Sequence, residues 1–310
     1  MIFKQGRNNL ALTVFVPYDC KNSCRFCTTK KSYSQKKANL AAVADQMRDI
    51  LYYYTFPITD VVFTGGEPME NVEALKRLVE MIEPLNKRVY INTTFTRKNM
   101  QEFVDLVNSN DTIRGVNISR HGETFERDAY LFENIVPDDA ISKIKKPVRI
   151  NCLDKGQNLE RIIDRWKKKD VELSIRRDYR EPMTEMQLHN PYDLTAMTLI
   201  KLGFAYTGKT QCNVCDTTIF EKEGMIVRYH KGMESSSILS GSVLEFNDLI
   251  IDQAGNIAYD WKGSDDRIMR DMLAEFNAFK RIFMSRPISC NCAASYSGGT
   301  GSICGGGSGC

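Results

Sequence analysis

Short runs rich in β-branched residues alternate with amphipathic segments along about the first 200 residues of this chain. Such alternation favours a parallel sheet with its helices on the outside. The runs that have the length and composition of strands are residues 12–16, 60–63, 88–93, 115–118, 148–153 and 171–175. Because a closed barrel of this kind needs eight strand–helix units, six units predict an open or partial barrel with its chemistry at the C-terminal strand ends.

Helical periodicity fills the gaps between these strands. Apolar residues spaced three and four apart predict helices over residues 40–54, 72–82, 159–166 and 194–202. The pattern then changes to two hairpins with turns at residues 222–224 and 253–255, followed by an amphipathic helix over residues 268–283. The predicted fold is therefore α/β. It has a partial, TIM-like (β/α)6 barrel over residues 1–205, a hairpin and helix extension over 206–286, and a tail over 287–310 rich in Cys, Gly and Ser.

Composition excludes several classes of protein. Lys and Arg total 42 against 39 Asp and Glu, and a net charge of +3 gives no argument for a nucleic-acid or anionic-membrane partner. No apolar run reaches the roughly 18 residues of a membrane-spanning helix, and the N-terminus has no secretion signal. We therefore expect a soluble, cytoplasmic protein.

The chain contains ten cysteines, and the cytosol keeps thiols reduced, so clustered cysteines favour metal binding over disulfides. Cys152 stands alone in an apolar, strand-like run and is interpreted as a buried thiol. The others form three groups: Cys20, Cys24 and Cys27; Cys212 and Cys215; and Cys290, Cys292, Cys304 and Cys310.

The first group has C-x3-C-x2-C spacing on the loop after the first predicted strand. Iron–sulfur clusters normally take four protein thiolates. Three close ligands, with the next cysteine 125 residues away (152 minus 27), predict a 4Fe-4S cluster with one iron open to an external ligand. A structural zinc site would more naturally show two ligand pairs, and the chain has only three His residues.

These cysteines resemble the hallmark of the radical S-adenosylmethionine (radical SAM) superfamily, which lies on the loop after the first strand of a partial (β/α)6 barrel. Phe26 matches the aromatic residue usual before the last cysteine. The second predicted strand ends in Thr64-Gly65-Gly66-Glu67-Pro68, which is similar to the element that holds the amino group of SAM. Two glycines allow backbone carbonyls to approach a ligand closely, and a Glu offers an acceptor for an ammonium group. The resemblance covers residues 10–205.

Weaker matches at later strand ends are closest to the branch with the molybdenum-cofactor biosynthesis enzyme and the peptide maturases. They include Asn92-Thr93-Thr94 on the third strand. In the family, such residues contact the ribose and carboxylate of SAM. By their chemistry, Ser119 and Asn151 could bond hydroxyls, and Arg176 or Arg177 could take a carboxylate.

The resemblance implies a 4Fe-4S cluster on the three cysteines, bound SAM, and an electron donor such as flavodoxin or ferredoxin. Reductive cleavage of SAM would give a 5′-deoxyadenosyl radical that abstracts hydrogen from a substrate. A peptide is the favoured substrate, with a small molecule as the alternative. A non-enzymatic iron–sulfur carrier or scaffold is the rival from another class.

The position of Cys212 and Cys215, between the barrel and the hairpins, resembles extensions that hold auxiliary clusters in peptide-modifying members. The sequence departs from that pattern at residues 258–261, where a cysteine would commonly follow the second hairpin. The pair is therefore interpreted as a metal half-site, a redox couple or two packed thiols. The tail cysteines have four interpretations. They could complete a second iron–sulfur cluster, hold a separate metal, form a flexible or added end, or belong to a peptide substrate fused to its own maturase.

Overall fold

The structure is a computed structural model that describes residues 2–5, 10–17, 20–22, 24–27, 37–53, 58–178, 181, 183–212, 214–233, 235–261, 274 and 278. The tail cysteines and nearly all of the helix predicted over residues 268–283 lie outside these residues. In the described part of the chain, no helix is both long and apolar enough to cross a lipid bilayer.

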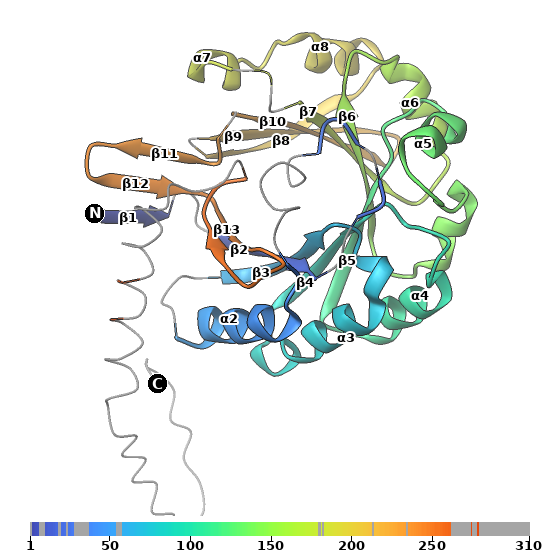
Figure 1. The fold of residues 1–310 in the computed structure, drawn as a ribbon. Coiled ribbons are helices and arrows are strands. Elements are labelled where there is room, and N and C mark those ends of the chain that lie inside the picture. The colour runs from blue at the N-terminus through green and yellow to red at the C-terminus, as the bar shows by residue number, and fades with distance from the viewer. Residues whose placement is uncertain are drawn as a thin grey trace, which may run out of the picture.

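Six parallel strands form the centre of the fold, with helices on their outer side (Figure 1). The strands are β2 (Leu10–Val16), β3 (Ile58–Gly65), β4 (Arg88–Thr93), β5 (Ile113–Ser119), β6 (Val148–Asp154) and β7 (Glu172–Arg177). The α-helices are α2 (Leu40–Tyr53), α3 (Val72–Glu80), α4 (Met100–Ser109), α5 (Phe125–Leu131) and α6 (Leu159–Trp166). Short 3-10 turns are η1 (Pro68–Asn71), η2 (Glu83–Leu85) and η3 (Asp138–Lys143). The predicted partial barrel is confirmed.

Alternating burial along each strand separates two faces of this sheet. On β6, Ile150 and Cys152 are buried in the main apolar core, together with Trp166 of α6. Arg149 and Asn151, which alternate with them, lie half-buried on the opposite, concave face. The core therefore fills the space between strands and helices, and polar side chains are left on the concave face.

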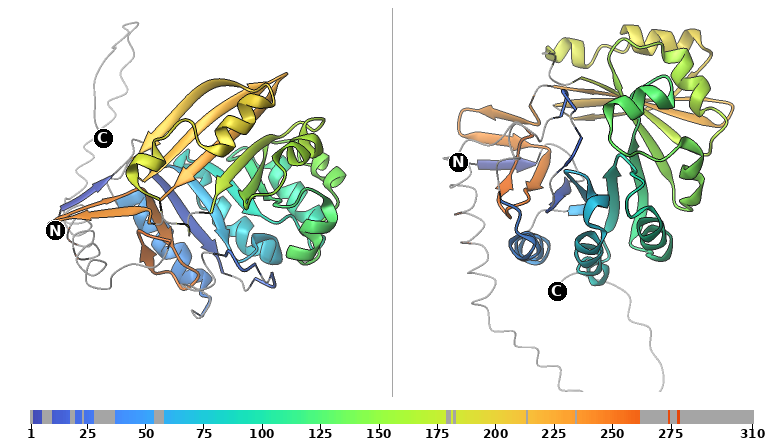
Figure 2. Two further views of the ribbon diagram at one scale, coloured as in Figure 1. Left: turned by 90° about the horizontal axis from the view of Figure 1, so that it is seen from above. Right: turned by 45° about the vertical axis from the view of Figure 1, so that its right-hand side comes forward.

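The two predicted hairpins are present, and both are built into the edges of the barrel sheet. The strands β8 (Ala205–Cys212), β9 (Cys215–Lys222) and β10 (Met225–Gly232) follow α7 (Glu185–Leu188) and α8 (Leu194–Lys201). Strand β10 pairs in parallel with β7, and it continues the curve of the sheet in both views of Figure 2. At the other edge, β13 (Asp248–Ile251) pairs in parallel with β2 and turns back into β14 (Ile257–Ala258).

The resulting sheet has 11 strands among the described residues, in the order β14-β13-β2-β3-β4-β5-β6-β7-β10-β9-β8. It is open, with β14 and β8 at its edges. A separate sheet of three strands joins β1 (Ile2–Gln5), β12 (Val243–Phe246) and β11 (Ser237–Ser240). Residues predicted as one extension thus hydrogen-bond to both ends of the barrel. The division at residues 205 and 286 stays a prediction.

The turn between β13 and β14 packs directly on the start of α2. Gly255 has a φ of +88°, and an added Cβ would lie 2.7 to 2.9 Å from the Cβ, C and O atoms of Ala42. The Asn39 N–H also donates to the Gln253 carbonyl over 2.8 Å. The second hairpin is therefore fixed to the helix that follows the cysteine loop.

We expect Gly255→Ala to destabilise the protein by about 2–4 kcal/mol, because it adds a left-handed alanine to a contact with no room for its methyl group. Gly224→Ala is the matched control. Gly224 also has a positive φ (+80°), but an added Cβ there has nothing within 4 Å, so about 1 kcal/mol is expected. Urea unfolding of the two variants measures the difference. Equal losses would contradict the packing argument.

Candidate metal centre

The three cysteines lie between β2 and α2, at the C-terminal edge of the parallel strands. Cys20 is exposed, whereas Cys24 and Cys27 are half-buried. The Cys27 N–H donates to the Cys24 carbonyl over 3.2 Å, which closes a turn. Partial shielding from water raises the pKa of Cys20 to about 11, and the charges of Glu67 and Cys27 add to this rise. It also raises the pKa of Cys24 to about 12, with a further contribution from Cys20 and Cys27. Cys20 and Cys24 are therefore protonated at neutral pH until a metal replaces the proton.

Asn22 joins this loop to the rest of the barrel edge. Its Nδ2 donates to Thr94 Oγ1 over 3.4 Å, and its Oδ1 accepts the Glu133 N–H over 2.7 Å. The Cys24 Sγ lies 3.9 Å from the Leu131 carbonyl oxygen. The cysteine loop is thus attached both to the end of β4 and to the segment around the end of α5.

Phe26, predicted beside the cofactor, packs at the ends of β5 and β6. Its ring meets the His121 ring edge-on, with 4.8 Å between centroids, and the Lys155 Nζ lies 3.6 Å from its centroid. Burial lowers the pKa of His121 to about 3, helped by the charges of Lys155 and Arg120. His121 is therefore a neutral ring at physiological pH, and its Nδ1 accepts the Leu153 N–H over 3.1 Å.

A buried ion-pair network holds the backbone at His121. The Asp128 Oδ1 accepts the N–H groups of His121 and Gly122 over 2.6 and 2.8 Å. Its Oδ2 binds Arg165 over 2.6 Å, and Arg165 also pairs with Asp138 over 2.7 Å. Sequence reasoning missed this network because its charged members are scattered over α5, η3 and α6, with no motif to link them.

The Gly-Gly-Glu-Pro motif ends β3 in a tight, buried turn. Gly65 has a φ of +120°, and an added Cβ would lie 3.0 Å from the Phe15 Cβ. Glu67 is 2% exposed and is the N-cap of η1, which starts with Pro68. Burial raises the pKa of Glu67, although hydrogen bonds to its carboxylate oppose the effect.

Four donors occupy the Glu67 carboxylate. Its Oε1 accepts the Met69 N–H over 3.2 Å and the Thr93 hydroxyl in a short hydrogen bond. Its Oε2 accepts the Thr94 N–H and hydroxyl over 2.7 and 2.6 Å. Glu67 therefore clamps the end of β3 to the end of β4. The prediction that its side chain accepts a ligand ammonium is left without support from this geometry.

The other predicted cofactor residues follow the strand ends from β5 to β7. Ser119 and Asn151 are direct neighbours across β5 and β6, and Asn151 in turn pairs with Ser174 on β7. Asn151 Oδ1 is buried and has no hydrogen-bond partner in the described residues. Arg176 is exposed near the end of β7, beside His230 of β10. The structure thus places three predicted polar side chains along one edge.

The predicted auxiliary half-site is the turn of a hairpin. Cys212 ends β8 and Cys215 begins β9, and the two residues are directly paired. Cys215 is disulfide-bonded, whereas a cluster ligand must be a thiolate. In the part of the chain that the structure describes, no three His, Cys, Asp or Glu side chains are gathered in an arrangement ready to hold a metal ion. The three loop thiols are near enough for Cys20 and Cys27 to affect the pKa of Cys24.

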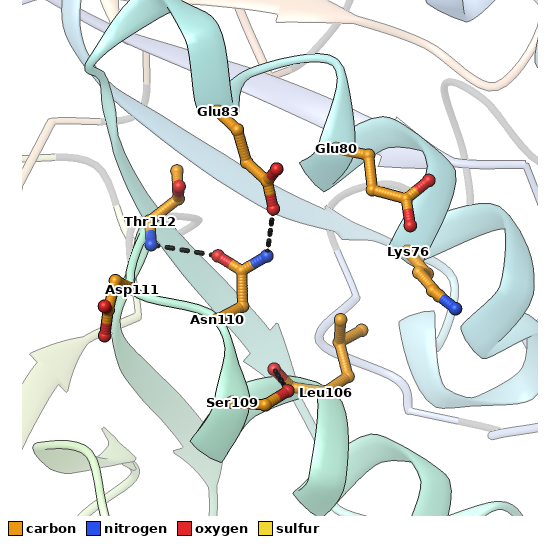
Figure 3. Close-up of a pocket in the computed structure, with 8 residues that line it drawn as sticks. All are labelled: Lys76, Glu80, Glu83, Leu106, Ser109, Asn110, Asp111 and Thr112. Carbon is orange, nitrogen blue, oxygen red and sulfur yellow. Dashed lines mark hydrogen bonds between the residues drawn. The ribbon is translucent and has the colours of Figure 1, made fainter.

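Of two cavities in the structure, one lies away from the cysteine loop and the other borders it. One of about 380 Å³ lies between α3 and α4, and its polar groups bond to one another, as Asn110 does with Glu83 over 2.5 Å (Figure 3). Another of about 660 Å³ borders the cysteine loop, and its wall includes His121, Leu131 and Lys155. The second cavity belongs to the candidate site, since these residues contact Phe26 and Cys24.

Comparison with known proteins gives one family match. Residues 6–128 match the family described as 4Fe-4S single cluster domain. This span contains the three cysteines and the motif from Gly65 to Pro68. Among curated proteins, no sequence matches the chain.

Several solved structures are similar at low identity. SuiB of Streptococcus suis bound to precursor peptide SuiA has 18% identity and a TM-score of 0.47, over 63% of this chain and 45% of that one. SuiB bound to S-adenosylmethionine has 19% identity and a TM-score of 0.48, over 63% and 46%. The radical SAM methyltransferase TsrM of Kitasatospora setae, with cobalamin and a [4Fe-4S] cluster, has 17% identity and a TM-score of 0.39, over 53% and 36%. The match spans less than half of each of these chains.

The family match confirms the 4Fe-4S domain that the cysteine spacing predicts. The Gly-Gly-Glu-Pro turn at the end of β3 lies within the same matched span.

Proposed function

We propose that this chain is a radical SAM enzyme that binds a 4Fe-4S cluster through Cys20, Cys24 and Cys27 and uses it to cleave SAM reductively. One observation carries the proposal: three thiols, and no fourth, share one loop at the C-terminal edge of the parallel strands. Cys152 does not add a fourth ligand, because it is 1% exposed within the core between β6 and the helices. Three thiolates leave one iron open to an exchangeable ligand.

The residues around the loop fit a bound SAM molecule. With the Glu67 carboxylate occupied, the backbone carbonyls of Gly65 and Gly66 are the acceptors that we assign to its ammonium group. The buried Asn151 Oδ1, which has no hydrogen-bond partner in the part of the chain that is described, fits a hydroxyl donor, and Ser119 lies beside it. Arg176 is the cation for its carboxylate. Phe26 and Pro68 supply apolar contacts.

Held by these residues, the cluster and SAM would supply one-electron chemistry for abstracting hydrogen from a substrate. The chain's own residues bind and orient the reactants and exclude water. The glycine turn, the Glu67 clamp and the Asp128 network fix the loops at the ends of β3, β4 and β5. A rigid setting of this kind holds reactive groups in position.

A peptide is the substrate class that we propose, with a small molecule as the alternative. Strand β10 runs parallel to β7, so its C-terminal end lies beside the ends of the barrel strands. Register places His230 and Arg228 on the same face as Arg176 and Ser174. Thr217 Oγ1 lies 2.7 Å from His230 Nδ1. These residues extend the polar concave face beyond the SAM residues, which suits an extended substrate.

Anaerobic reconstitution, followed by dithionite and SAM, tests the reaction. About four irons per chain and 5′-deoxyadenosine as a product are expected. An intact cluster that yields no 5′-deoxyadenosine would favour the carrier or scaffold instead. About eight irons per chain would support a second, auxiliary cluster.

The peptide substrate is tested separately, with peptides encoded by short Gly- or Cys-rich reading frames beside the gene and with the chain's own tail. Mass spectrometry after turnover should show a loss of about two hydrogens per crosslink. Steady 5′-deoxyadenosine formation without any change in these peptides would favour a small molecule.

A further inference from the structure

The segment at the C-terminal end of α5 packs along the cysteine loop. The Leu131 carbonyl oxygen lies 3.9 Å from the Cys24 Sγ. The Phe132 and Phe26 rings meet edge-on, with 6.5 Å between their centroids. Asn22 Oδ1 accepts the N–H of the residue after Phe132 over 2.7 Å. Three contacts therefore fix this end of α5 against the loop that carries the proposed ligands.

Tyr130 immediately precedes this segment and points away from the protein. It is 89% exposed, which is the largest fraction for any large hydrophobic side chain in the described residues. It also lines the cavity of about 660 Å³ that borders the cysteine loop. A rigid aromatic ring beside a recess is typical of the side chains that contribute most to protein–protein binding. Because single exposed rings are common on protein surfaces, the place of Tyr130 and the charge around it decide its meaning.

The cysteine segment beside this ring is basic. Residues 20–37 contain six Lys or Arg and no Asp or Glu. Three of these cations lie in the described part of the chain, and all three are exposed: Lys21, Arg25 and Lys37. An excess of one charge on a surface favours partners of the opposite charge and speeds their encounter.

Charges on the α5 side are close to balanced. Glu123 lies 3.7 Å from Arg127 and 3.5 Å from Arg161. Glu126 and Glu133 are exposed carboxylates near the same cavity and loop. The positive excess of this surface therefore comes from the cysteine segment, and the α5 side contributes the aromatic ring and the recess.

We propose that Tyr130, Lys21 and Arg25 form the docking surface for the electron donor, an acidic one-electron carrier protein. The inference rests on the proposed 4Fe-4S site. One electron passes from the reduced carrier to the cluster, so the carrier is oxidised, the cluster is reduced and no bond breaks. Tyr130 is bonded to Leu131, whose carbonyl oxygen lies beside Cys24, so a carrier docked here comes close to a proposed ligand. Redox partners form small interfaces, for which one aromatic ring and a few charges are sufficient.

The test compares two kinds of reductant on the reconstituted enzyme, with 5′-deoxyadenosine formation as the readout. Dithionite is a small molecule that needs no docking surface, whereas reduced flavodoxin and reduced ferredoxin are acidic carrier proteins that do. We expect Tyr130→Ala to raise the KM for the carrier about tenfold, the loss typical of an interface ring. The dithionite-driven rate and the iron content should stay at their wild-type values.

Tyr206→Ala is the matched control for the loss of an exposed ring. Tyr206 is 59% exposed and lies near the start of β8. Since β8 runs in the same direction as β10 and the barrel strands, Tyr206 lies at the edge opposite the cysteine loop. Its KM for the carrier should equal that of the wild type.

Charge is tested with Lys21→Ala, which should raise the KM for the carrier at low salt. The difference from the wild type should shrink as salt is added, because salt screens exposed charges. Lys76→Ala removes an exposed lysine from α3 and should change neither value. Iron content is measured beside each rate, since Lys21 is next to Cys20 in the chain.

A wild-type KM for both carriers in Tyr130→Ala would overturn the inference. An equal loss of activity with dithionite and with the carriers would also overturn it, because the surface would then serve the substrate or the fold. A wild-type enzyme that works with dithionite but with neither carrier would do the same. Each of these results leaves the proposed function standing, whereas no 5′-deoxyadenosine from the wild type under dithionite would overturn both.

Discussion

Replacing Cys24 with alanine should remove the cluster and reduce 5′-deoxyadenosine formation to background. Cys24 is one of only three thiols on the loop, and two thiolates are not expected to retain a 4Fe-4S cluster. Iron and sulfide content per chain, measured with product formation under dithionite, gives the result. Because Cys24 is half-buried and makes only a long contact with the Leu131 carbonyl, the fold should survive the change.

Cys152→Ala is the matched control, since it also removes one thiol. Cys152 is 1% exposed, and its Sγ lies 3.8 Å from the His121 carbonyl oxygen and 3.4 Å from Gln157 Nε2. We expect full iron content and a loss of about 1 kcal/mol in the free energy of unfolding. A cluster that persists in Cys24→Ala, or disappears in Cys152→Ala, would contradict the ligand assignment.

Replacing Glu67 with alanine should destabilise the protein by about 3 kcal/mol or more. The change removes an acceptor shared by Met69, Thr93 and Thr94 and leaves their buried donors without partners. Chemical denaturation measures the loss. SAM binding should weaken with it, because the Gly65-Gly66 turn is no longer fixed to the end of β4.

Two further variants separate this clamp from general effects of charge. Glu73→Ala removes an exposed carboxylate of α3 that lies 3.0 Å from Arg77, and less than about 1 kcal/mol is expected. Glu67→Gln keeps the size of the side chain and one acceptor oxygen, so its cost should lie between the other two. A Glu67→Ala variant as stable as Glu73→Ala would show that the clamp is unimportant.

Local patterns were sufficient for the strands and most helices of the barrel. The predicted range 88–93 is β4, and 159–166 is α6, because alternation and helical spacing there reflect one buried face. The turn at residues 222–224 was visible from its glycine, and Gly224 indeed has a positive φ. Strand β8 was missed, since its exposed, polar residues lack the apolar alternation of a half-buried strand.

The sequence did not indicate which barrel strands the two hairpins pair with. Nothing near residues 225–232 indicates parallel pairing with β7, and nothing near 248–251 indicates β2, because register between distant strands depends on tertiary packing. The same limit applies to Glu67. Its motif was recognised, but its four donors come from η1 and from the last residue of β4 and the residue after it, and their approach follows from the fold.

Sequence alone predicted the 4Fe-4S domain that the family match finds over residues 6–128, because the three cysteines and the glycine turn are contiguous motifs that can be recognised without the fold. Tertiary structure decided which atoms remain available to a ligand. It occupied the Glu67 carboxylate, left Asn151 Oδ1 without a hydrogen-bond partner among the described residues and brought Lys155 to Phe26. Such contacts join residues far apart in the chain, so they arise only when strand ends from separate units meet at one edge of the sheet.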